Sequence, residues 1–126
     1  MKTKLLLVAC AFLFLSMQCD DDNNTGITQN MLDIKKQEIV SFINSFSCDE
    51  NSNCNYIAFG AKPCGGPREY LVFSSNVDLA TLQTIVNEYY AMDNAYNIQT
   101  NAISDCLLVG PPTNIGCTNN ICTIIN

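Results

Sequence analysis

The sequence predicts a small α+β domain in which two helices pack on one face of an antiparallel sheet of about four to five strands, stapled by three disulfides. Three observations favour this fold. Two stretches carry apolar residues at helical spacing, several short β-rich stretches lie between glycines, prolines and asparagines, and six cysteines remain once the leading segment is set aside. The expected order of elements is α-β-β-α-β-β-β.

The beginning of the chain has the layout of an export signal. Two lysines precede an apolar run over residues 5–17, whose 13 residues match the ~7–15 of a signal core and fall short of the ~20 that span a bilayer. Cys19 follows closely, and this layout resembles a bacterial lipoprotein signal, although Gln18 stands where a small residue is usual. We therefore expect residues 1–18 to be removed and Cys19 to carry lipid, palmitate included; plain secretion is the alternative.

Residues 19–29 are expected to form an acidic, flexible tether, because three aspartates and several small polar residues cannot build a core. Acidic residues directly after the lipidated cysteine send lipoproteins of some Gram-negative bacteria to the outer membrane or cell surface, and the resemblance implies that location in the cell envelope here. From Cys19 onward the chain has four basic residues against twelve acids, a net charge of −8. This charge excludes nucleic acid as a partner and leaves the lipid as the expected attachment to the membrane.

The chain contains eight cysteines. Cys10 lies inside the apolar run and is expected to leave with the signal, and Cys19 takes the lipid. The remaining even set indicates three disulfides, because the exported compartment is oxidising. Zinc is the rival ligand, but the chain has no histidine and its closest cysteine pair is separated by four residues, so we expect no metal and no cofactor. The disulfide candidates are Cys48, Cys54, Cys64, Cys106, Cys117 and Cys122.

The domain itself is expected over residues 30–126 and begins with an amphipathic helix over residues 31–46, where the apolar residues fall on one stripe. The polar loop over residues 49–53 then starts like an EF-hand calcium loop. Cys54 and Gly60 stand where that loop needs glycine and glutamate, so we expect a turn held by the loop's own side chains instead.

Two strands are expected over residues 55–61 and 69–75, as antiparallel neighbours. The loop between them contains two prolines and two glycines, which predict a rigid and sharply turning segment. We regard this loop as the candidate binding surface. Its candidate contact residues are Lys62, Pro63, Gly65, Gly66 and Arg68.

A second helix is expected over residues 79–94, followed by a third strand over residues 102–109. Residues 115–118 and 121–125 then form a hairpin around Asn119-Asn120, because asparagine tolerates the positive φ angles of two-residue turns. The expected core comprises Ile39, Phe42, Ile43, Ile57, Phe59, Leu71, Phe73, Leu82, Ile85, Val86 and Leu107.

The hairpin also makes one disulfide arguable. It places Cys117 opposite Cys122 in a non-hydrogen-bonded pair, whose Cβ atoms come within ~4.5–5.5 Å of each other. That separation is near the ~3.5–4.5 Å of a disulfide. We prefer this bridge, with a link from either cysteine to another element as the alternative; the other four cysteines would then allow three connectivities.

Several short sequences occur together in this chain. Residues 59–67 read Phe-Gly-Ala-Lys-Pro-Cys-Gly-Gly-Pro, followed by Tyr-Leu-Val, by Ser-Asp-Cys at residues 104–106 and by the last two cysteines. Over residues 48–122 the chain thereby resembles a family of small cysteine-rich exported bacterial domains, many of them lipoproteins. The Lys-Pro-Cys-Gly-Gly-Pro core is the most specific part. No activity is established for that family, so the resemblance assigns no catalytic residue.

The absence of histidine removes Ser–His and Cys–His nucleophile pairs, and no phosphate-binding glycine motif occurs. We expect a membrane-anchored envelope lipoprotein that acts as a non-enzymatic binding or structural module, with another envelope or extracellular protein as its partner. One alternative is a protease inhibitor that presents residues 61–67 with Lys62 as bait, although Pro63 would hinder cleavage there. The other is a small hydrolase with a carboxylate pair drawn from Glu69, Glu88, Asp93 and Asp105, although solvated surface acids are the simpler interpretation.

Overall fold

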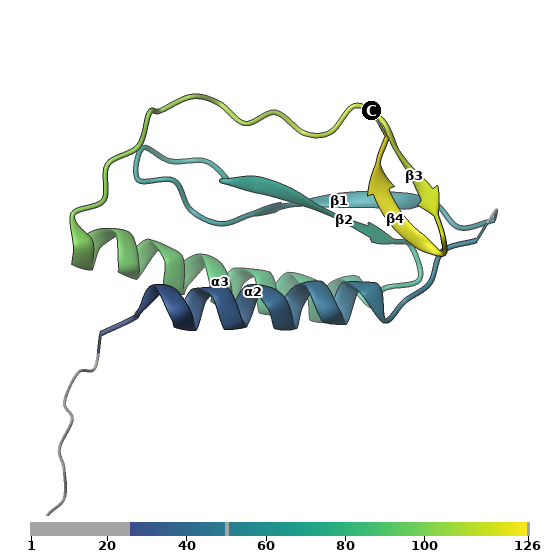
Figure 1. Ribbon diagram of the computed structural model, residues 1–126, viewed down its shortest axis with the longest axis horizontal. Coiled ribbons are helices and arrows are strands. Elements are labelled where there is room, and N and C mark those ends of the chain that lie inside the picture. Colours follow the sequence, from purple (N-terminus) through teal and green to yellow (C-terminus); the bar gives the residue numbers. More distant parts are fainter. Residues whose placement is uncertain (1–25, 50, 126) are drawn as a thin grey trace, which may run out of the picture.

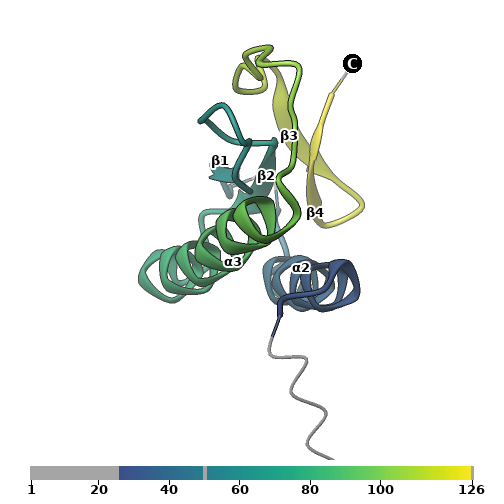
Figure 2. The same ribbon diagram turned by 90° about the vertical axis from the view of Figure 1, so that its left-hand side faces the viewer.

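The computed structural model describes residues 26–49 and 51–125. Two helices, α2 over Gln29–Asn44 and α3 over Leu79–Thr100, lie side by side and run in opposite directions under the strands (Figure 1). The strands form two antiparallel hairpins, and the predicted α+β class with three disulfides is confirmed (Figures 1 and 2). The strands are β1 (Cys54–Phe59), β2 (Glu69–Ser74), β3 (Ile115–Thr118) and β4 (Ile121–Ile124).

The predicted signal over residues 1–18, the lipidation site Cys19 and the tether up to residue 25 lie outside the described residues. The described end of the tether is attached to the domain. Ile27 packs against the core, its backbone N–H donates to Gln99 Oε1 at 3.0 Å, and its carbonyl accepts from Gln99 Nε2 at 3.0 Å. Within the described residues, neither helix has the length and apolar character needed to cross a membrane.

Side chains cap both helices at their first turns. Thr28 accepts a hydrogen bond from the backbone N–H of Met31, and Asp78 accepts one from the N–H of Ala80. Helix α3 continues six residues beyond the expected end at Asn94, to Thr100, and stops at Asn101 in the left-handed conformation with φ 49°. One polar residue of this extension, Asn97, is buried against the rest of the domain.

β1 and β2 pair in antiparallel register with Ile57 opposite Leu71. One face of this hairpin covers the two helices, and the core lies between these layers (Figure 2). Six of the expected core residues are buried: Ile39, Ile43, Phe59, Phe73, Leu82 and Val86. Phe42, Ile57, Leu71 and Ile85 pack against them as partly buried residues, and the core also takes Leu32, Val77 and Tyr89.

The predicted third strand over residues 102–109 is wrong. The chain from the end of α3 to β3 is irregular and arches over β1 and β2 (Figure 1), so there are four strands in two sheets of two rather than one larger sheet. Local hydrogen bonds compete with a ladder there, since Ser104 Oγ accepts from the N–H of Cys106 and Asp105 Oδ1 accepts from the N–H of Leu107. Cys106 adopts a positive φ of 56°, and Leu107, expected in the core, is 67% exposed.

The predicted β3–β4 hairpin is confirmed, with Cys117 opposite Cys122 and with positive φ at both asparagines of the turn. The predicted Cys117–Cys122 disulfide is wrong. The bonds are Cys48–Cys117, Cys54–Cys122 and Cys64–Cys106, with Cα–Cα distances of 5.8, 5.7 and 5.4 Å. All six cysteines expected to form disulfides do so.

Tertiary packing explains the change of partners. The turn of the β3–β4 hairpin docks where the chain leaves α2, and the backbone N–H of Cys48 donates to the carbonyl of Asn120 at 3.0 Å. That contact brings Cys48 and the first residue of β1, Cys54, within reach of the two hairpin cysteines. Bridges between residues 69 and 68 positions apart also restrict the unfolded chain far more than a bridge across a tight turn would.

Candidate functional site

All four basic side chains after Cys19 form ion pairs, and each pair joins two different segments of the fold. The partners are the four acids that the sequence offered for carboxylate chemistry. None of these acids is therefore a free carboxylate, and no two of them pair with the same base. The pairs are Lys35–Glu88, Lys36–Glu69, Lys62–Asp105 and Arg68–Asp93.

Lys62, the expected bait of an inhibitory loop, turns back onto the domain. Its side chain is only 15% exposed, and its Nζ donates to Asp105 Oδ1 at 3.0 Å and to the carbonyl of Leu107 at 2.7 Å. The hydrogen bond from Lys62 holds the pKa of Asp105 below its usual value. Lys62 therefore ties the loop to the irregular 102–114 segment instead of projecting from it.

The loop itself is a closed turn. The N–H of Lys62 donates to the carbonyl of Gly66 at 2.9 Å, and the N–H of Gly65 donates to the carbonyl of Lys62 at 2.8 Å. Cys64 at its tip is bonded to Cys106. Of the remaining candidate contact residues, Pro63, Gly65 and Gly66 are exposed at the surface, whereas Arg68 turns toward α3.

A buried carboxylate fixes the base of this loop. Asp93 on α3 is 2% exposed, and its Oδ2 accepts from the backbone N–H of Ala61 at 2.7 Å and from Arg68 Nε at 2.8 Å. Asn97, one turn along, accepts from Arg68 Nη2 at 2.7 Å and donates to the carbonyl of Ala61 at 2.8 Å. The hydrogen bond to Asp93 also raises the pKa of Arg68.

Sequence reasoning missed this network because it treated Asp93 as a surface acid. A signal was present: Leu82, Val86 and Tyr89 repeat at helical spacing, and continuing the same stripe by one and two turns reaches Asp93 and Asn97. Two polar residues on a buried stripe indicate that they have hydrogen-bond partners inside the domain.

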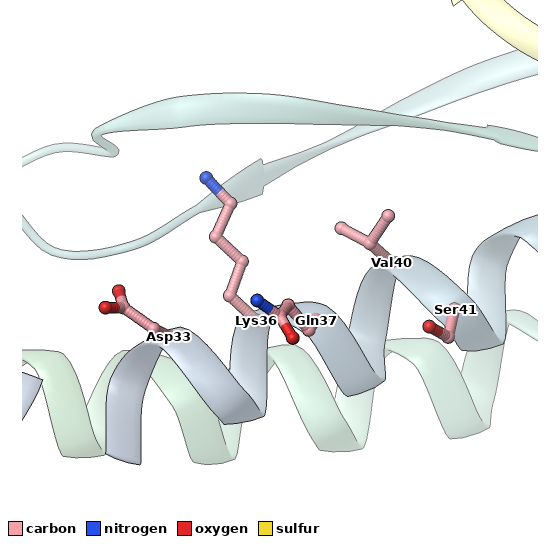
Figure 3. A pocket seen from close by; sticks show the side chains of 5 residues that line it. All are labelled: Asp33, Lys36, Gln37, Val40 and Ser41. Atoms are coloured by element: carbon pink, nitrogen blue, oxygen red, sulfur yellow. The ribbon is translucent and has the colours of Figure 1, made fainter. Parts of the chain in front are cut away.

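A polar groove of about 370 Å³ lies beside this network, between α2, α3 and the start of β2. Burial raises the pKa of Tyr89, on its wall, to about 12. A second, open pocket of about 500 Å³ adjoins it along α2, where Lys36 and Val40 point toward the strands (Figure 3). Lys36 bonds Glu69 there, so the positive charge of this surface is already neutralised.

A third hollow, of about 320 Å³, lies between β1 and α3. Gly66 and Pro67 of the candidate loop contribute to it, so the loop does take part in forming a groove. The rest of its lining is uncharged. β1 and its end supply Ile57, Ala58 and Gly60, and α3 supplies Gln83, Val86, Asn87 and Tyr90.

Two further features concern metal ions. In the loop after α2, Asp49 Oδ1 accepts from the N–H of Asn51 at 2.9 Å and from Ser52 Oγ at 2.7 Å, which confirms the expected side-chain turn. These hydrogen bonds, chiefly the one from Ser52, lower the pKa of Asp49. Among the described residues, the sulfurs of Cys48, Cys54 and Cys122 lie within 4.8 Å of one another, but all three are engaged in disulfides.

Comparison of the chain with protein-family models, with curated protein sequences and with solved structures found no match.

Proposed function

We propose that this chain is an exported, lipid-anchored envelope protein that acts as a non-enzymatic binding or structural module, and that it belongs with the small cysteine-rich lipoproteins it resembles. The observation that carries the proposal is the set of four ion pairs. Every acid considered for catalysis neutralises a lysine or arginine, so each of these groups is used to hold two segments together. Three long-range disulfides suit a domain that works in an oxidising compartment.

The two alternatives receive less support. A protease inhibitor needs an exposed side chain on an extended segment, whereas Lys62 is 15% exposed and lies in a closed turn. A carboxylate hydrolase needs two acids that share a reacting centre. Asp93 is the most buried of the four acids. Both of its carboxylate oxygens accept hydrogen bonds from within the domain, from Arg68 and from the N–H of Ala61.

The anchor is tested by labelling cells with palmitate while they express the full chain. We expect the wild type to take up label and to sediment with membranes, and the Cys19→Ala variant to lose the label. Cys10→Ala is the matched control and should keep it. An unlabelled wild-type protein, or label that persists in Cys19→Ala, would contradict the proposal. Separation of inner and outer membranes then tests the proposed outer-membrane location.

A further inference from the structure

The outer edge of β1 has no partner strand among the described residues. The N–H of Ser75 donates to the carbonyl of Asn53, which places the hydrogen-bonded pairs of the ladder at every second residue from there, at Asn55 and Ile57. The N–H and C=O groups of Tyr56 and Ala58 therefore point away from β2. No backbone or side-chain group of the described chain bonds to them.

The surface beside this edge is chemically suited to a polypeptide backbone. The hollow between β1 and α3 runs along it, and the half-buried Ile57 and the buried Val86 give it an apolar floor. Across the hollow, α3 presents the exposed amides of Gln83 and Asn87, each of which carries both donors and acceptors. A strand in the hollow would thus find hydrogen-bonding groups on both of its edges.

We propose that the edge of β1 binds an extended peptide segment of another exported protein, which joins the sheet as a third strand beside α3. This mode of recognition takes its affinity from main-chain hydrogen bonds and its specificity from pockets for alternate side chains. The inference rests on the proposed function, since it names the partner class of the binding module. It also gives the Gly66–Pro67 turn a role, since this turn lines the same groove and the carbonyl of Gly66 accepts from the N–H of Lys62.

The charges of the groove and of the whole domain indicate which kind of peptide the groove would bind. None of the groove's lining residues is charged, which favours an uncharged central segment. The chain from Cys19 onward carries a net charge of −8, so a second copy of this protein would be repelled, whereas basic residues flanking the peptide would be attracted. We therefore expect an uncharged strand with basic flanks.

The test titrates the purified, lipidated protein in detergent with a labelled peptide in which valine alternates with threonine between two pairs of lysines. We expect saturable binding by fluorescence anisotropy and slower hydrogen exchange at the amides of Tyr56 and Ala58. Ala58→Pro removes an outward donor and obstructs the edge, and should weaken binding by about tenfold or more, whereas Ala58→Thr keeps the N–H and should bind.

Asn87→Ala tests the opposite wall and should weaken binding by about threefold to tenfold, while Asn94→Ala, on the same helix but outside the lining, serves as its control. Absence of binding by the wild type would overturn the inference. Binding by Ala58→Pro and Asn87→Ala that is as tight as binding by the wild type would also overturn it. So would self-association of the wild type that Ala58→Pro abolishes, because a second copy would then be the occupant. Palmitate labelling is independent of all these variants, so this failure would leave the proposed anchor intact.

Discussion

Cys117 and Cys122 face each other across the β3–β4 hairpin, yet each forms its disulfide with a different segment of the chain. Cys117 is bonded to Cys48, just after α2, and Cys122 is bonded to Cys54 at the start of β1. The hairpin thereby fastens the end of the first helix to the beginning of the first strand. A bridge between the two hairpin cysteines would have left the hairpin without a disulfide to either of these segments.

This connectivity can be checked on unreduced peptides. Mass spectrometry of a digest should find Cys48 linked to Cys117, Cys54 to Cys122 and Cys64 to Cys106. A peptide that joins Cys117 to Cys122 would contradict the arrangement.

The Cys64–Cys106 bond has a separate, local role, because it is the covalent tie between the 61–67 loop and the irregular 102–114 segment. We expect Cys64→Ser combined with Cys106→Ser to lower the free energy of unfolding by about 2–4 kcal/mol. Hydrogen exchange should accelerate in the 102–114 segment through local opening, whereas the core amides of α2 should accelerate only as far as the loss of unfolding free energy accounts for. Equal acceleration in both would mean that the bond supports the whole domain.

The buried ion pair should matter more than an exposed one. Asp93→Ala leaves Arg68 uncompensated and the N–H of Ala61 without its acceptor, and should lower the free energy of unfolding by about 2–3 kcal/mol. This loss lies at or below the lower end of the range of about 3–5 kcal/mol for a broken buried pair, because the Arg68 side chain is 41% exposed. Glu88→Ala breaks the exposed pair with Lys35 and should cost less than about 1 kcal/mol. Denaturant unfolding with the disulfides intact measures both; similar losses would show that Asp93 is not a structural centre.

Gly60 is required by both its conformation and its surroundings. Its φ is +78°, and a Cβ placed there would meet Arg68 Cγ at 3.0 Å. We expect Gly60→Ala to destabilise the domain by about 1–3 kcal/mol. Gly110→Ala is the control, since nothing lies within 4 Å of a Cβ at that position, and it should change stability by less than about 0.5 kcal/mol. Thermal unfolding of the two variants gives the comparison.

Tyr89 makes the free energy of unfolding depend on pH in the alkaline range. Burial raises its pKa from 10.0 to about 12, so the folded state holds the proton more tightly than the unfolded state. Its contribution is fully present below pH 10.0 and is lost as the pH rises toward 12. Tyr89→Phe keeps the stacking on Phe59, whose ring centroid is 4.1 Å away, and should reduce this alkaline loss. Identical pH profiles for the two proteins, measured by denaturant unfolding, would refute the assignment.

The sequence alone determined the elements whose signals are local. Helical periodicity identified α2 and α3, alternation and turn residues identified the two hairpins, and the two asparagines predicted the positive φ angles of the second turn. The even cysteine count predicted the three disulfides but not their pairing. These features succeed because each depends on residues that are neighbours along the chain.

Only the tertiary structure decided the rest. Cysteines in one sequence are chemically equivalent, so their partners follow from which segments pack together, and docking of the hairpin beside Cys48 made that choice. Residues 102–109 have strand-like composition, but they pair with none of the described strands and their own side chains bond their backbone. Asp93 is buried because Arg68 and Ala61, distant in sequence, supply hydrogen bonds that replace water.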